Sequence, residues 1–380
     1  MQNQRLQTID VIKGLGCICI ALLHFIVLGF RPQNALSLYL FVDIFALASG
    51  YIICMKYHSF VLKANGVQSF LAKRYKRIYI VYLPALVIAF IFLFMPEVVV
   101  KAPREQILSY VFFVLRDVLL LPIVQGSNFL LRQLWTVSCE LVCYVLFCIT
   151  TLFFAYLFSK ITNLKNNRQK FISFGFWLHC GYFALAVFTF IFWFFWYRYH
   201  SASGITGLDR NTELYNINAS LISGFYRVAC EFYIGVVAYL LSRFMGLYFT
   251  KINLKVFHEI AKVFLMITLG YIFFLSSSTF TAGGSYSGSS FDIIVPLCFS
   301  FFLIFSYGNM SVFKGTLPKI LSFFGRQSYS FYIWHILVYE LLATYTNILT
   351  LNIFYAVFVM MFVTIILSNL SYKILESRRM

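Results

Sequence analysis

The chain has 380 residues, of which 61% are hydrophobic, 20% aromatic and only 11% charged, and its mean hydropathy is +0.83. No soluble core could bury that much apolar surface, so the composition excludes a water-soluble globular protein. It predicts an all-α, polytopic integral membrane protein forming a single transmembrane domain over residues 1–380. The formal net charge of +17 would indicate nucleic acid in a soluble protein, but here the cations lie in short loops between apolar segments, so the lipid bilayer is the expected partner and nucleic acid is not.

The apolar segments predict about ten transmembrane helices of roughly 20 residues each. The first carries Asp10 and Lys13, lacks a small-residue cleavage site, and is expected to remain as a span. A short apolar segment at 106–122 contains Arg116 and Asp117 and is expected to be re-entrant or to lie on the outer surface. The expected spans are 9–29, 37–57, 78–97, 134–158, 172–197, 219–242, 257–276, 291–308, 328–346 and 352–373.

The distribution of basic residues sets the expected orientation. With ten crossings, most Lys and Arg residues fall on one side, including the cluster 160–170, and the positive-inside rule makes that side cytoplasmic. The prediction is a multi-pass protein of the plasma (inner) membrane with both termini in the cytoplasm. The nine cysteines lie inside apolar runs, which favours small buried side chains over disulfides or a zinc site, so no metal site is expected.

The first predicted span carries a cation and an imidazole on one face. Lys13 and His24 are eleven residues apart, which on a helix brings them to within about 20° of the same direction and separates them by about 16 Å along the axis. Such a helix could hold a charged donor at one end and perform proton chemistry at the other.

Two carboxylates are expected near the depth of His24. Asp43 and Glu140 each lie about six residues below the outer end of their predicted span, and His24 lies about five below the end of its own. Ionisable groups inside a membrane are costly and tend to face a cavity or one another. We therefore predict that His24 acts as a general base, oriented by Asp43 or Glu140. The alternative is that His24 is a packing residue.

Four cations precede the third predicted span. Arg74 and Arg77 are three residues apart, so a helix would project them from the same side, where paired guanidiniums suit phosphate or carboxylate groups. The competing interpretation is a lipid-headgroup or stop-transfer cluster.

A polar stripe runs along the ninth predicted span. Ser328, Tyr332, His335 and Tyr339 fall at i, i+4, i+7 and i+11 on one helical face, which indicates either a cavity or hydrogen bonds between helices. Arg227 and Glu231 are i, i+4 on another predicted span, so mutual pairing is their simplest explanation.

Five motifs in order resemble those of the membrane-bound acyltransferase 3 family, from residue 5 to about 375. Ile9-Asp10-Val-Ile-Lys13-Gly14 with His24 is similar to the family's Leu-Asp-x-x-Arg-Gly start and Arg-x10-His motif, with lysine in place of arginine. The second motif is Phe41-Val-Asp43-Ile-Phe45-Ala-Leu-Ala-Ser49-Gly50-Tyr51, and the third is Arg74-x-x-Arg77-Ile-Tyr. The fourth is Leu134-Trp135-Thr-Val-Ser138-Cys-Glu140. Ser328-Tyr-Ser-Phe-Tyr332-Ile-Trp-His335 matches most closely.

The resemblance implies transfer of an acyl group, typically acetyl, from cytoplasmic acyl-CoA to a hydroxyl of an envelope glycan, lipid-linked glycan or other extracytoplasmic acceptor. Acetyl-CoA would be a substrate, with no permanently bound cofactor. In the family's terms His24 would be the catalytic residue, and Arg74 and Arg77, with Lys13, would bind the donor. The expected depth of Asp43 and Glu140 adds these two carboxylates to the catalytic group. The resemblance also suggests residues that line the cavity or contact substrate: Ser49, Trp135, Ser138, Ser328, Tyr332 and His335.

Three mechanistic and functional alternatives remain at this point. Direct attack of the acceptor on the thioester is expected, because no activated Ser or Cys elbow stands out, but a covalent acyl-enzyme is the competing route. A proton-coupled transporter or flippase of lipid-linked sugars would use the same buried groups differently, but its internal repeats and broken paired helices are not evident. A scaffold or sensor would leave the shared depth of His24, Asp43 and Glu140 unexplained.

Overall fold

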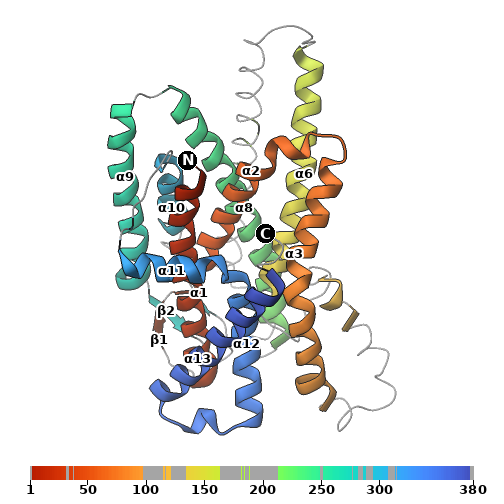
Figure 1. The fold of residues 1–380 in the computed structure, drawn as a ribbon, viewed down its shortest axis with the longest axis vertical. Helices are drawn as coiled ribbons and strands as arrows, with labels where there is room; N and C mark the ends of the chain where they lie inside the picture. The colour runs from red at the N-terminus through yellow and green to blue at the C-terminus, as the bar shows by residue number, and fades with distance from the viewer. Residues whose placement is uncertain are drawn as a thin grey trace.

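The computed structural model describes residues 2–30, 34–36, 38–96, 134–162, 213–248, 251–275, 277–280, 286–287, 294–306 and 315–376, with parts of 114–120 and the single positions 181, 184, 188 and 313. Long helices dominate these residues and run mostly along the vertical axis of Figure 1. The long helices are α1 (Gln2–Phe30), α2 (Phe41–Val61), α3 (Gly66–Ala89), α6 (Leu134–Thr162), α8 (Glu213–Tyr248), α9 (Lys251–Gly270), α10 (Ile294–Phe305), α11 (Thr316–Arg326), α12 (Ser328–Tyr345) and α13 (Ile353–Ser371).

Shorter helical turns extend several of these helices. Two 3-10 turns precede α2 and α13, at Leu38–Leu40 and Ile348–Thr350. Single π-helical turns follow α3, α9 and α13 at Phe90–Phe94, Tyr271–Leu275 and Tyr372–Glu376. The predicted all-α class is therefore confirmed for the long elements of the described chain.

Six of the described helical segments are long and apolar enough to cross a membrane. They are Gln7–Phe30, Leu38–Val61, Gly66–Phe94, Trp135–Leu157, Lys255–Phe274 and Ile353–Glu376. Helix α10 is apolar but shorter, and the expected spans 219–242 and 328–346 correspond to α8 and α12, which are not among the six. The expected span 172–197 lies outside the described residues apart from three single positions. The total of about ten spans stays a prediction.

The segment expected to be re-entrant or to lie on the surface is described in part. Within 114–120, Asp117 is fully buried, and its backbone carbonyl accepts a hydrogen bond of 2.5 Å from the Tyr82 hydroxyl. This contact holds that part of the segment against α3.

Helices α2 and α8 approach so closely that two glycines are required. A Cβ at Gly50 would lie 1.8 Å from the carbonyl oxygen of Phe232, and one at Gly235 would lie 2.1 Å from that of Leu47. Small residues let membrane helices approach to backbone contact, where van der Waals packing stabilises their association. This contact holds Asp43 and Ser49 of α2 in a fixed position relative to α8.

Helix α11 lies across α1 rather than alongside it (Figure 1). The crossing is again at backbone contact, because a Cβ at Gly14 would lie 1.9 Å from the carbonyl oxygen of Leu321 and one at Gly325 would lie 1.8 Å from that of Asp10. Lys13 lies next to this crossing, so α11 covers the Lys13 end of the expected Lys13–His24 face.

Three short strands form the only sheet among the described residues. Strand β1 (Asn34–Leu36) pairs antiparallel with β2 (Ser277–Phe280), which pairs antiparallel with β3 (Tyr286–Ser287). Asn34 pairs with Thr279 and Leu36 with Ser277. The sheet ties the connection after α1 to the connection after α9, on the side of the molecule where α1 ends.

Candidate active site

The imidazole of His24 on α1 lies against that of His335 on α12. The Nδ1 atom of His24 is 2.9 Å from Nε2 of His335, and the ring centroids are 5.1 Å apart with the planes inclined at 25°. On its other side, Nδ1 of His335 is 2.7 Å from the backbone carbonyl oxygen of Tyr332. His335 is 1% exposed and His24 is half-buried, so His24 is the more exposed residue of the pair.

The expected orientation of His24 by Asp43 or Glu140 is therefore corrected. Among the described residues, the hydrogen-bond partner of His24 is His335, which is 311 positions away in the chain. The two carboxylates are not at one level either. Glu140 bonds to Ser49, which is six residues beyond Asp43 on α2, or about 9 Å further along the helix. Each carboxylate instead has partners of its own.

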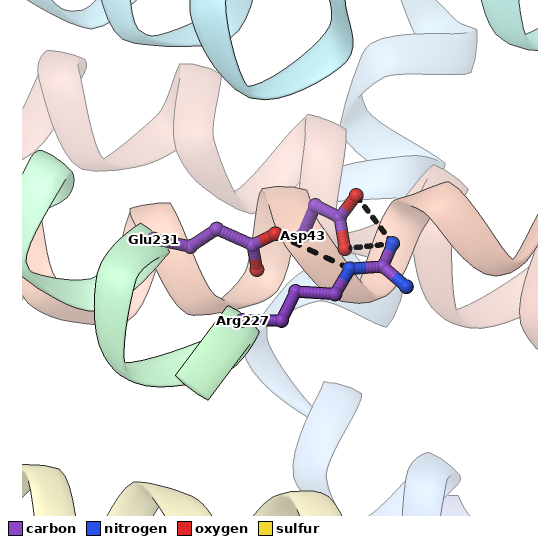
Figure 2. Close-up of polar contacts among 3 residues, drawn as sticks. All are labelled: Asp43, Arg227 and Glu231. Carbon is purple, nitrogen blue, oxygen red and sulfur yellow. Dashed lines mark hydrogen bonds and ion pairs between the residues drawn. The ribbon is translucent and has the colours of Figure 1, made fainter. Parts of the chain in front are cut away.

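Asp43 forms an ion pair with Arg227 of α8, as Figure 2 shows. Arg227 Nη2 is 2.6 Å from Asp43 Oδ2, and its Nε is 3.4 Å from Glu231 Oε1, so one guanidinium contacts two carboxylates. The expected Arg227–Glu231 pair is present, but Asp43 is the closer partner. With side-chain exposures of 3% for Asp43 and 27% for Arg227, the group fixes α2 against α8.

Glu140 accepts two hydrogen bonds through the same oxygen. The hydroxyls of Ser49 on α2 and of Tyr144, one turn along α6, both donate to Glu140 Oε1, the latter at 2.5 Å. The two hydroxyls satisfy a carboxylate that would otherwise be costly inside a membrane. Ser49, expected to line the cavity, therefore belongs to the environment of Glu140.

Arg74 is buried among aromatic rings, whereas Arg77 is exposed. The guanidinium carbon of Arg74 lies 4.6 Å from the ring centroid of Tyr57, and 5.9 and 5.8 Å from those of Phe70 and Tyr144. The two arginines were expected to project from the same side of the helix, and this prediction is wrong, because Arg74 is on the buried face and Arg77 is on the exposed one. Three residues on a helix differ by about 60° in direction, and here that angle separates the buried face from the exposed one.

Several cations gather where α1, α2, α3 and α11 meet. Asp10 lies within electrostatic range of four of them: Lys13, Lys56, Arg77 and Arg326. Lys13 is half-buried and is also within range of Glu140. Glu376, 4% exposed at the end of α13, accepts a hydrogen bond from Ser330 and lies within electrostatic range of Arg77 and Lys13. The cations outnumber the acids in this group.

The polar stripe of α12 is turned toward the interior. Ser328 and His335 are buried, and the hydroxyl of half-buried Tyr332 lies 2.7 Å from that of Thr136 on α6. Trp135 is half-buried at the start of α6, and Ser138 is 1% exposed, with a hydroxyl that has no hydrogen-bond partner among the described residues. The stripe thus makes interhelical hydrogen bonds and reaches His24.

Together these residues form a polar series between Arg74 and His24, made of two sets of contacts one helical turn apart on α6. It begins at Arg74, Tyr144 and Glu140, continues one turn along α6 to Thr136, and crosses to Tyr332 and His335. Tyr144 and Thr136 are eight residues apart, which corresponds to about 12 Å of helix. The series runs from a buried cation near the basic group to the half-buried His24.

Sequence reasoning missed the partners rather than the principal side chains. Tyr57, Thr136, Lys56 and Arg326 were not expected in the site. Tyr144 follows Glu140 at i+4, a spacing that favours contact on a helix, so it could have been identified. The other four come from α2, α6 and α11 and carry no comparable local signal.

Comparison with family models gives one match over nearly the whole chain. Residues 6–372 match the model of the acyltransferase domain of the acyltransferase 3 family. Comparisons with curated proteins and with solved structures gave no match. The matched range includes His24, Arg74, Glu140 and His335, and the structure contains helices able to span a bilayer. The chain therefore belongs to the acyltransferase 3 family and is a membrane acyltransferase.

Proposed function

We propose that the protein is an O-acetyltransferase that takes an acetyl group from cytoplasmic acetyl-CoA and transfers it to a hydroxyl of an envelope glycan or lipid-linked glycan. The supporting observation is the polar series that leads from Arg74 to the imidazole of His24. In this proposal the protein lies in the plasma (inner) membrane with both termini in the cytoplasm.

The basic group around Asp10 would bind the anionic end of the donor. Lys13, Lys56, Arg77 and Arg326 come from four different helices, and their excess of positive charge suits the phosphates of a CoA ester. Arg74 is set deeper, and its Nε has no hydrogen-bond partner among the described residues, which leaves a charged donor available to a ligand. The lysine at position 13 supplies charge but not the two-pronged geometry of arginine.

His24 would act as the general base of a direct transfer. It removes the proton from the acceptor hydroxyl as the hydroxyl oxygen attacks the thioester carbonyl carbon, and the C–S bond then breaks to release the CoA thiolate. The proton held by His24 passes to that thiolate. Among the described residues, no serine or cysteine side chain is hydrogen-bonded to His24, so the described geometry favours direct transfer over an acyl-enzyme.

The test is transfer of label in sealed membranes. The protein is reconstituted into vesicles with a lipid extract of bacterial membranes, and [1-¹⁴C]acetyl-CoA is supplied to one face only. The proposal predicts base-labile label in glycan only when the donor meets the face bearing Arg77 and Arg326. Movement of lipid-linked sugar across the bilayer with no labelled product would contradict the proposal and support the flippase alternative. Vesicles containing Arg74→Ala protein serve as the donor-binding control.

A further inference from the structure

The orientation of His335 is fixed by a group that can only accept hydrogen bonds. Its Nδ1 lies 2.7 Å from the backbone carbonyl oxygen of Tyr332, three residues earlier on α12. A carbonyl oxygen accepts and cannot donate, so the hydrogen of this contact belongs to Nδ1 of His335. A neutral imidazole carries one N–H, and Nε2 of His335 is then a lone-pair acceptor.

This assignment determines which nitrogen of His24 carries its hydrogen. Nδ1 of His24 lies 2.9 Å from the acceptor Nε2 of His335, so His24 donates through Nδ1 and keeps its own Nε2 unprotonated. We infer that His335 is a positioning residue that holds His24 in the tautomer with an unprotonated Nε2. This nitrogen receives the proton of the hydroxyl group that is to be acetylated. The inference rests on the proposed function and replaces the carboxylate expected in this role.

The surroundings of His335 hold its ring in place. The side chain is 1% exposed, and the rings of Phe25 and Tyr332 are tilted against it with centroids 6.4 and 5.5 Å away. The ring is therefore confined by packing on α1 and on its own helix as well as by its two hydrogen bonds. Because its ring is confined, His335 can select one tautomer of His24. Rotation of His335 away from His24 would break both of its hydrogen bonds.

A neutral His335 stabilises the protonated form of His24 less strongly than a carboxylate would. When the O–H bond of the hydroxyl to be acetylated breaks, Nε2 of His24 gains the proton. The new positive charge is shared with uncharged His335 through the hydrogen bond from Nδ1–H of His24 to Nε2 of His335. A carboxylate would stabilise this imidazolium by charge attraction. With His335 in its place, the proton is held less strongly and returns more readily to the thiolate when the C–S bond breaks.

Two substitutions separate this role from simple packing. His335→Asn places an amide where Nδ1 was, so it can still donate to the Tyr332 carbonyl but leaves His24 without an acceptor. His335→Gln places an amide oxygen where Nε2 was, so it can still accept from His24. We expect kcat for acetyl transfer from [1-¹⁴C]acetyl-CoA to fall about 10- to 100-fold in His335→Asn, with KM for acetyl-CoA unchanged, and to be largely recovered in His335→Gln.

A spectroscopic measurement reads the tautomer without any reaction. Protein labelled with ¹⁵N-histidine in nanodiscs is examined by NMR, with the His24 signals assigned by their loss in His24→Asn. We expect an unprotonated Nε2 and a protonated Nδ1 for His24 in the wild-type protein, and a mixture of tautomers in His335→Asn. A wild-type His24 protonated on Nε2, or a folded His335→Asn protein with unchanged kcat, would overturn the inference. A wild-type protein that transfers no label would contradict the proposed function instead, and the NMR result would still decide the tautomer.

Discussion

The guanidinium of Arg74 lies over the ring of Tyr57, 4.6 Å from the ring centroid, and this contact joins α3 to α2 inside the helical bundle. An aromatic face stabilises a cation without neutralising it. No salt bridge joins Arg74 to an acid among the described residues, so its charge is held in place by Tyr57, Phe70 and Tyr144 and remains available to an anion. This is an arrangement suited to binding a ligand rather than to closing an internal ion pair.

Replacing Arg74 by alanine is expected to weaken donor binding. Loss of a buried charged hydrogen-bond donor should raise the KM for acetyl-CoA about 10- to 100-fold. Lys76→Ala is the matched control, because Lys76 is an exposed cation on the same helix, and the KM of this variant should stay near that of the wild type. Steady-state kinetics in nanodiscs measures both. Equal effects of the two substitutions would indicate that the cations near the start of α3 bind lipid headgroups rather than the donor.

Asp43 and Arg227 are expected to be energetically coupled. Asp43→Asn and Arg227→Gln each break an ion pair between α2 and α8, and the double variant should be less destabilised than the sum of the two by about 1–3 kcal/mol. Denaturant unfolding in mild detergent measures the cycle. Because Asp43 does not bond to His24 in the described structure, kcat of the folded Asp43→Asn protein should fall far less than that of His24→Ala. Additive free energies would contradict the coupling.

The close approach of α2 and α8 predicts a large cost for a single methyl group. Gly50→Ala would place a Cβ against the Phe232 carbonyl and should lower the free energy of unfolding by about 1–3 kcal/mol or more. Gly270→Ala is the control, because a Cβ there would have no heavy atom within 4 Å, and removing a helical glycine should stabilise by up to about 1 kcal/mol. A thermal melt of both variants compares them. Equal melting temperatures would show that α2 and α8 can move apart without a loss in the free energy of unfolding.

Local pattern predicted the helices and many of the important side chains. The spacing of Lys13 and His24 required one continuous helix, and α1 runs unbroken from Gln2 to Phe30. The Ser328–His335 stripe required an inward-facing helix, and α12 buries both of these ends. These features depend on a repeat of 3.6 residues per turn, which a sequence displays directly.

The same reasoning could not predict which side chains on different helices contact one another. Depth counted from the end of an apolar run placed Asp43 and Glu140 beside His24. The ends themselves lie close to those expected, because α1 ends at Phe30, the turn before α2 begins at Leu38 and α6 begins at Leu134. Depth along each helix does not determine which faces of the helices meet. Which side chains meet also depends on helix rotation, and the backbone contacts at Gly50 and Gly14 set that rotation through residues far away in the chain.

The central claim is that the imidazole of His24 removes the acceptor's proton. The most direct measurement is single-turnover transfer of label from [1-¹⁴C]acetyl-CoA by His24→Ala protein in nanodiscs, beside His58→Ala, which removes another inward-facing imidazole from α2. Loss of a general base should slow transfer about 10²- to 10⁴-fold in His24→Ala while acetyl-CoA binding is retained, and His58→Ala should transfer label at nearly the wild-type rate. Transfer by folded His24→Ala at the wild-type rate would contradict the account.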